Sequence, residues 1–142
     1  MSYTRIFIHF IWSTKNREEL ITKDLKPLLL EHIKANAKKK QIFIDTINCV
    51  EDHIHLLVSL GREQTVSKTA QLLKGESSHW MNAKKLSGSE LEWQDEYIAV
   101  SVSKSAEENV RKYIRNQIEH HKTKSFSEEY ELFLKKYGFD KS

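Results

Sequence analysis

Two histidines one residue apart open an apolar run in the stretch EDHIHLLVSL, residues 51–60. On a β-strand, side chains two residues apart lie on the same face, roughly 7 Å apart along the strand. His53 and His55 could therefore bind one metal ion together, although an ordinary solvated strand face would look the same. The opposite face would be the core side, which predicts that the histidines lie on the less buried face. That core side would carry Ile54, Leu56, Val58 and Leu60.

A second candidate pair stands in YIRNQ, residues 113–117. Residues i and i+4 are neighbours on a helix surface, so Tyr113 and Gln117 would project together. A phenol has a pKa of about 10 and needs a nearby cation or base to act as a nucleophile at neutral pH. The alternative is a tyrosine that packs on a sheet with its hydroxyl at the edge.

The rest of the chain predicts the elements that position these side chains. β-Branched and aromatic runs indicate strands, a helical period of apolar residues indicates helices, and Ser-x-x-Glu signatures start two helices at Ser105 and Ser125. Strands are predicted at 3–12, 41–50, 53–60 and 97–102, helices at 24–40, 65–84, 105–122 and 125–138, and a loop at 86–90. This order gives an α+β fold: a ferredoxin-like β-α-β-β-α-β core with an antiparallel sheet, an additional C-terminal helix that carries Tyr113, and a short helical tail.

Composition predicts one domain over residues 1–142, with a core at about 3–122 and the tail at about 125–138. The single Cys49 cannot form an internal disulfide, and no secretory signal is visible, so a cytoplasmic location is expected. The longest apolar stretch, residues 6–12, is too short to span a membrane.

The net charge is +3, and basic segments flank an acidic middle, which permits a phosphate-binding face but also fits ordinary solvated helices.

Four segments together resemble a known enzyme family in their order and spacing. They are HFIWSTKNR (9–17), EDHIHLLVSL (51–60), LLKGESS (72–78) and YIAVSVSKSAEENVRKYIRNQ (97–117). The family is the single-tyrosine HUH (His-hydrophobe-His) transposases, the TnpA enzymes of minimal bacterial insertion sequences, and the resemblance covers roughly residues 3–120. The segment after Gln117 is longer than minimal members need and is similar to the related REP-associated tyrosine transposases, which are domesticated relatives with the same chemistry.

The resemblance implies metal-dependent cleavage and rejoining of single-stranded DNA. His53, His55 and Gln117 would hold a divalent ion, Mg²⁺ or Mn²⁺, and Tyr113 would attack a phosphodiester to give a 5′-phosphotyrosine and a free 3′-hydroxyl. The substrates would be hairpins at transposon ends. The protein would be a homodimer in which the tyrosine helix of one subunit can complete the site of the other.

Basic side chains near these motifs are candidate DNA contacts through backbone phosphates. They are Lys15, Arg17, Lys74, Arg111 and Arg115. Trp12, Trp80 and Trp93 could stack on unpaired bases or pack in the core. Two other function classes stay open: a non-catalytic module of the same fold that binds single-stranded or hairpin DNA, and a metal-dependent phosphodiesterase that uses water.

Overall fold

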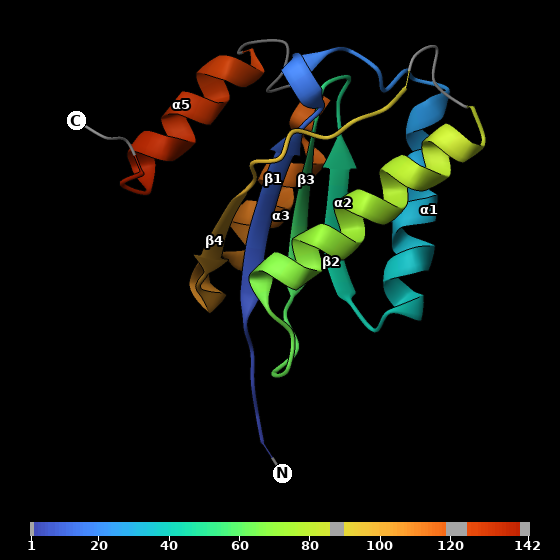
Figure 1. Cartoon of the computed structure of the whole chain (residues 1–142). Coiled ribbons are helices and arrows are strands. Elements are labelled where there is room, and N and C mark those ends of the chain that lie inside the picture. Colours follow the sequence, from blue (N-terminus) through green and yellow to red (C-terminus); the bar gives the residue numbers. More distant parts are fainter. Residues whose placement is uncertain (1, 86–89, 119–124, 140–142) are drawn as a thin grey trace.

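A four-stranded antiparallel sheet forms the centre of the protein (Figure 1). The computed structural model describes residues 2–85, 90–118 and 125–139. The strand order is β2-β3-β1-β4, so the two central strands are the first and third in the chain. The strands are β1 (Phe7–Ser13), β2 (Phe43–Cys49), β3 (His53–Ser59) and β4 (Ile98–Val102). The predicted ferredoxin-like plan is thus confirmed, with strand ends that differ by a few residues from those predicted.

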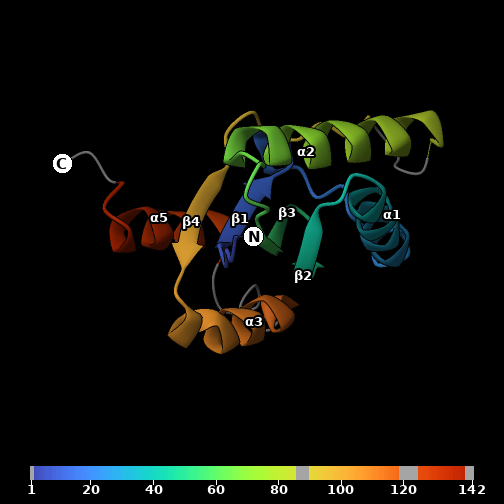
Figure 2. The ribbon, with the colours of Figure 1, turned by 90° about the horizontal axis from the view of Figure 1, so that it is seen from below.

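Helices cover both faces of the sheet, and Figure 2 shows α2 and α3 on opposite sides. One face, with Phe10 and Leu56, packs against buried residues of α1 and α2. The other face meets α3 through Leu57 and Ile114, and α5 through Ile11 and Phe126. The helices are α1 (Leu25–Lys39), α2 (Val66–Ala83), α3 (Glu107–Arg115) and α5 (Phe126–Lys136), with short 3-10 turns η1 (Lys15–Arg17) and η2 (Lys104–Ala106). Among the described residues, no helix has both the length and the apolar character that crossing a membrane requires.

The helix that carries Tyr113, α3, begins and ends at other residues than predicted. Ser105 lies inside the turn η2, so α3 begins only at Glu107, and its last residue is Arg115. The predicted start at Ser125 is confirmed, because the Ser125 hydroxyl accepts a hydrogen bond from the Glu128 amide. Residues 86–89 of the predicted loop and 119–122 of the predicted third helix lie outside the described residues.

The histidine face of β3 is not the less buried face, and this prediction was wrong. His53, His55 and Leu57 are all 0% exposed, like Ile54 and Leu56 on the opposite face. The physical reason is that two helices, α3 and α5, pack on this face, whereas alternation along one strand indicates only which residues share a face.

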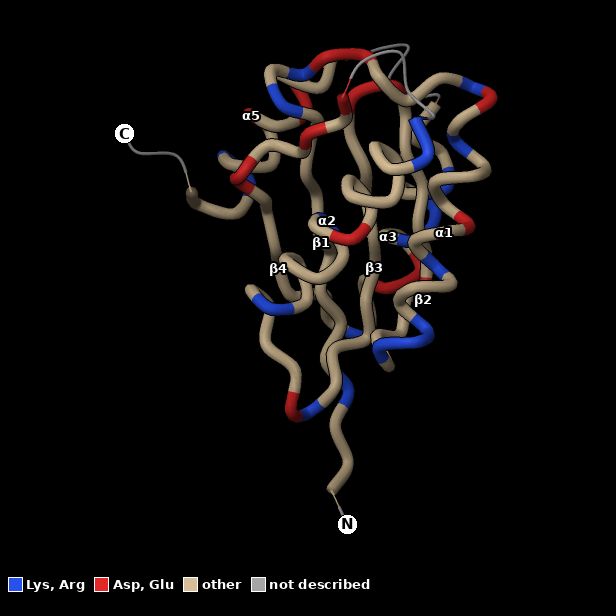
Figure 3. The backbone as a smooth tube through the Cα atoms, turned by 45° about the vertical axis from the view of Figure 1, so that its right-hand side comes forward, with Lys and Arg blue, Asp and Glu red and all other residues tan. Residues whose placement is uncertain are grey.

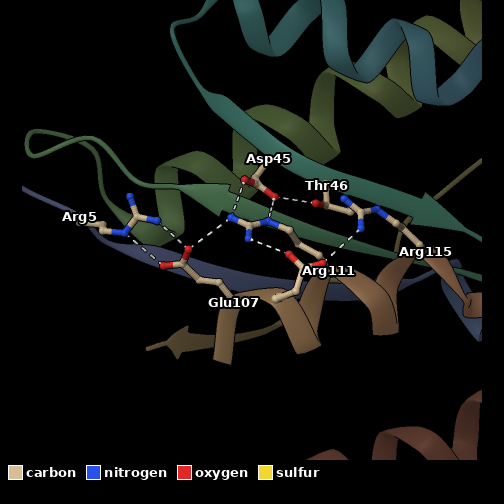
Figure 4. Close-up of polar contacts among 7 residues, drawn as sticks. Arg5, Asp45, Thr46, Glu107, Arg111 and Arg115 are labelled. Carbon is tan, nitrogen blue, oxygen red and sulfur yellow. Dashed lines mark hydrogen bonds and ion pairs between the residues drawn. The ribbon is translucent and has the colours of Figure 1, made fainter. Parts of the chain in front are cut away.

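A chain of ion pairs fastens α3 to the neighbouring strand and to the N-terminal segment (Figure 4). The Arg111 guanidinium donates to both carboxylate oxygens of Asp45 on β2, at 2.8 and 3.1 Å. It also donates to the buried Glu107, which accepts from Arg5 at 2.7 Å. At the other end of α3, the Asn48 amide donates to the carbonyls of Ile114 and Arg115 and so satisfies helix-terminal acceptors. These contacts fix the helix that carries Tyr113.

Asp45→Asn should lower the free energy of unfolding by about 1 kcal/mol at pH 7, since a partly exposed ion pair contributes at most about that much. The hydrogen bond from Arg111 lowers the pKa of Asp45 in the folded protein. The stabilisation is therefore present above the unfolded pKa of about 3.9 and is lost as the pH falls through the lowered folded value. Urea unfolding of both proteins between pH 7 and pH 3 measures this.

The matched control is Glu31→Gln on the exposed side of α1. We expect it to leave stability nearly unchanged at every pH. A difference between the parent protein and Asp45→Asn that stays constant down to pH 3 would contradict the assigned ion pair.

Candidate active site

The two β3 histidines lie at the centre of a buried polar cluster between the sheet, α3 and α5. Ligand atoms of His53, His55 and Glu129 all lie within 4.8 Å of one another. Glu129 comes from α5, and one of its carboxylate oxygens is 2.8 Å from Nε2 of His55. The other carboxylate oxygen is 3.9 Å from Nε2 of His53. The cluster thus joins two segments that are far apart in the sequence.

Glu129 was not found from the sequence. The Ser125–Glu128 signature placed a helix at this position in the chain, but no local pattern indicated that this helix would pack on the histidine face. Of the two acids in its first turn, Glu128 is exposed, whereas Glu129 is 4% exposed. An acid one residue after the capping glutamate is the sole sequence signal, and it is a weak one.

Gln117 lies in the cluster, and its role as a metal ligand stays a prediction. Its Oε1 lies 3.2 Å from Nε2 of His53, and its side chain is fully buried. Its Nε2 donates to the Tyr113 carbonyl at 3.3 Å. Because α3 ends before Asn116, Gln117 follows the helix end rather than lying within α3.

The second ring nitrogen of each histidine also has a partner. Nδ1 of His53 is 2.8 Å from a carboxylate oxygen of Asp52, and Nδ1 of His55 is 2.9 Å from Nε2 of His9 on β1. Hydrogen bonds of this kind orient a metal-binding imidazole so that its other ring nitrogen faces the metal. Both histidines therefore turn Nε2 toward Gln117 and Glu129. Asp52 and His9 were not singled out from the sequence.

Tyr113 completes the cluster from α3. Its ring centre is 5.6 Å from that of His55, and its hydroxyl hydrogen-bonds with Glu129 and Gln117. Burial, followed by the negative charge of Glu129, raises the pKa of Tyr113 above its ordinary value. Burial would also raise the pKa of Glu129, but its hydrogen bond to His55 and the charges of both histidines outweigh this and lower it. The phenol is thus held neutral beside an ionised carboxylate.

The donor set fits a divalent cation. Two imidazoles, a carboxylate and an amide oxygen are ligand types that Mn²⁺ and Mg²⁺ accept, and the first three already converge. The carboxylate also supplies negative charge that a bound cation would offset. Cys49, in contrast, is fully buried in the core on the other side of the sheet, so it takes no part in this cluster.

The five predicted DNA contacts all have partners within the protein. Lys15 pairs with Glu92, and the Lys74 ammonium donates to the carbonyls of Gln94 and Asp95. Arg17 donates to Ser127 and lies over two rings of α5. Arg111 belongs to the Asp45 ion pair, and Arg115 lies 3.7 Å from Glu108.

Figure 3 shows that Lys and Arg positions follow α1, whereas the strands of the sheet carry none. A DNA contact for each of the five stays a prediction.

Two of the three tryptophans pack in the core, and the third is partly exposed. Trp12 and Trp93 are buried and meet edge-to-face at 6.1 Å. Trp80 is half-buried and stacks on His32 at 4.1 Å between ring centres.

Comparison with known proteins gives one family and several relatives. The family model for IS200-like transposases matches residues 2–117. The ISDra2 transposase TnpA of Deinococcus radiodurans is 28% identical over 115 residues, which cover 77% of this chain and 81% of that protein.

Two solved structures share the fold. A crystal structure assigned as a transposase from Deinococcus radiodurans R1 superposes with a TM-score of 0.65 at 21% identity, over 82% of this chain and 93% of that one. A REP-associated tyrosine transposase bound to a REP hairpin superposes with a TM-score of 0.64 at 17% identity, over 85% and 72% of the two chains.

Asp52→Asn should weaken Mn²⁺ binding about 10- to 100-fold, because the loss of an outer hydrogen bond to a ligand histidine has that typical effect. Isothermal titration of the purified protein with MnCl₂ measures the affinity directly. The control Asp95→Asn removes an exposed carboxylate beside Lys74 and should leave it unchanged. Equal affinities for all three proteins would show that Asp52 does not position His53.

Proposed function

This chain belongs to the family of IS200-like transposases, and from that membership we propose that it is a single-tyrosine HUH transposase that cleaves and rejoins single-stranded DNA. Tyr113 is the proposed nucleophile. One observation carries the proposal: the Tyr113 hydroxyl, two imidazoles, the Gln117 amide and the Glu129 carboxylate converge in one buried cluster.

The proposed metal ligands are His53, His55 and Gln117, with Glu129 added by the tail helix. The cation would be Mg²⁺ or Mn²⁺, since both take oxygen ligands. When bound, such an ion acts as a Lewis acid that offsets negative charge on the scissile phosphate. Asp52 and His9 hold the two imidazoles in the required orientation.

The reaction follows from the position of the phenol. The Tyr113 oxygen attacks phosphorus and forms a P–O bond, and the bond from phosphorus to the 3′-oxygen breaks. The phenol proton leaves as the P–O bond forms and ends on the departing 3′-oxygen, and the Glu129 carboxylate beside the phenol is placed to carry it. The products are a 5′-phosphotyrosine and a 3′-hydroxyl, and the reverse attack by a 3′-hydroxyl rejoins DNA and restores the tyrosine.

The proposed substrates are DNA hairpins with single-stranded flanks at the ends of an insertion sequence. The fold shared with a REP-associated transposase that is bound to a hairpin supports this choice. The alternative is a domesticated REP-associated transposase with the same chemistry.

A homodimer also stays a proposal. The cluster as described is formed by residues of one chain, so sharing of the site between subunits is not needed to assemble it.

Tyr113→Phe should abolish the covalent protein–DNA adduct while hairpin binding stays within about twofold, because one oxygen atom is lost and the ring remains. Denaturing gels with labelled hairpin oligonucleotides from the flanks of the gene, with Mn²⁺, measure the adduct. Tyr3→Phe, at a residue 91% exposed, is the control and should retain it. An adduct that persists in Tyr113→Phe would contradict the assignment of the nucleophile. DNA cleaved without any adduct in the parent protein would indicate the water-using phosphodiesterase instead.

His55→Ala should lose cleavage by at least about 100-fold and lose tight Mn²⁺ binding, since it removes a metal ligand. Titration with MnCl₂ and the gel assay together measure both effects. His79→Ala removes an exposed histidine of α2 and should change neither. Adduct formation that is unaffected by His55→Ala or by chelator would refute metal dependence, and hairpin binding without any adduct in the parent protein would favour the non-catalytic binding module.

A further inference from the structure

A cavity between α3 and α5 opens beside the proposed nucleophile. Its volume is about 610 Å³, and both Tyr113 and Glu129 line it. Pockets that bind small organic molecules have volumes of about 300–1,000 Å³. The cavity is therefore large enough for one unpaired nucleotide. Because Tyr113 lines the cavity, a DNA strand bound at Tyr113 would lie beside it.

Aromatic rings form one wall of the cavity. Phe133 of α5 and Tyr137, the residue that follows α5, both line it, with ring centres 6.0 Å apart and planes within 12° of parallel. Phe133 also meets the Tyr113 ring edge-on at 5.7 Å. Nearly parallel rings offer the flat apolar surface on which unpaired bases stack in proteins that bind single strands.

Two exposed polar side chains are also part of the lining. Asn109 and Lys136 line the cavity and are exposed. The Asn109 carboxamide can donate to and accept from a base edge, and the Lys136 ammonium can attract a neighbouring phosphate. A mostly apolar cavity with a few polar groups is the composition expected of a specific ligand site.

We propose that this cavity binds one unpaired base next to the phosphodiester bond that Tyr113 attacks. The proposal rests on the proposed function, which supplies single-stranded DNA as the ligand. It goes beyond family membership, because Glu129, Phe133, Lys136 and Tyr137 lie beyond residues 2–117 that the family model matches. Base stacking in the cavity would hold the strand in register with the nucleophile.

The test uses hairpin oligonucleotides with the fluorescent base 2-aminopurine at each position of the single-stranded flank in turn. They bind to the Tyr113→Phe protein with Mn²⁺, so no cleavage occurs. We expect strong quenching at one position, because stacking on an aromatic ring quenches this base. In the same background, Phe133→Leu and Tyr137→Leu should each restore the fluorescence and weaken binding roughly fivefold or more. Phe139→Leu, which removes a ring of the same tail that is 50% exposed, is the control and should do neither.

An abasic nucleotide at the quenched position tests whether the base and the Phe133 ring contribute to binding through the same contact. It should weaken binding to the Tyr113→Phe protein by a similar factor and have much less effect on the Phe133→Leu variant, since the stack is already lost. If adducts form in the parent protein but the fluorescence quench depends on Phe133 or Tyr137 at no position of the flank, the proposed base site is wrong and the transposase function stands. If no hairpin gives an adduct but the quench depends on both rings, the base site stands and the proposed chemistry fails.

Discussion

Two imidazoles can be buried on a sheet face only if their polar nitrogens find partners, and this requirement organises the protein. A buried donor or acceptor without a partner costs about 1–3 kcal/mol. Asp52 and His9 satisfy the Nδ1 atoms of His53 and His55, and Gln117 and Glu129 face the Nε2 atoms. These partners come from strand β1, from the turn between β2 and β3, from the residues that follow α3, and from α5. Both helices must therefore pack on the histidine face for the cluster to exist.

The attachment of α3 decides where the phenol lies. Apolar contacts of Ile114 with Leu57 give the helix its buried side, but such contacts have little directional preference. The Arg111–Asp45 pair (Figure 4) adds direction at the middle of the helix, and the Asn48 hydrogen bonds add it at the C-terminal end. Arg111, two positions before the proposed nucleophile Tyr113, thus helps to hold α3 in place, because its guanidinium contacts Asp45 of β2 and Glu107.

The Glu129 carboxylate has the central electrostatic role in the cluster. The charge of Glu129 raises the pKa of Tyr113, while the histidines lower the pKa of Glu129 itself. Without a further positive charge the phenol is a poor nucleophile. A cation bound among these donors would offset the charge of the carboxylate and would lower the pKa of the Tyr113 phenol. The tail helix links this balance to the aromatic cavity, since Glu129 belongs to both.

The sequence by itself determined the elements, their order and the pairs that local spacing brings together. Alternation along β3 placed His53 beside His55, the helical period gave α1 and α2, and the spacing of four brought Tyr113 near Gln117. The tertiary structure alone decided that the histidine face is buried and that Glu129 and His9 reach it. The reason is physical: local periodicity determines which side chains share a face, but the partner of that face depends on packing between distant segments. Asp52 lies next to His53 in the chain, yet only the fold directs its carboxylate to that imidazole.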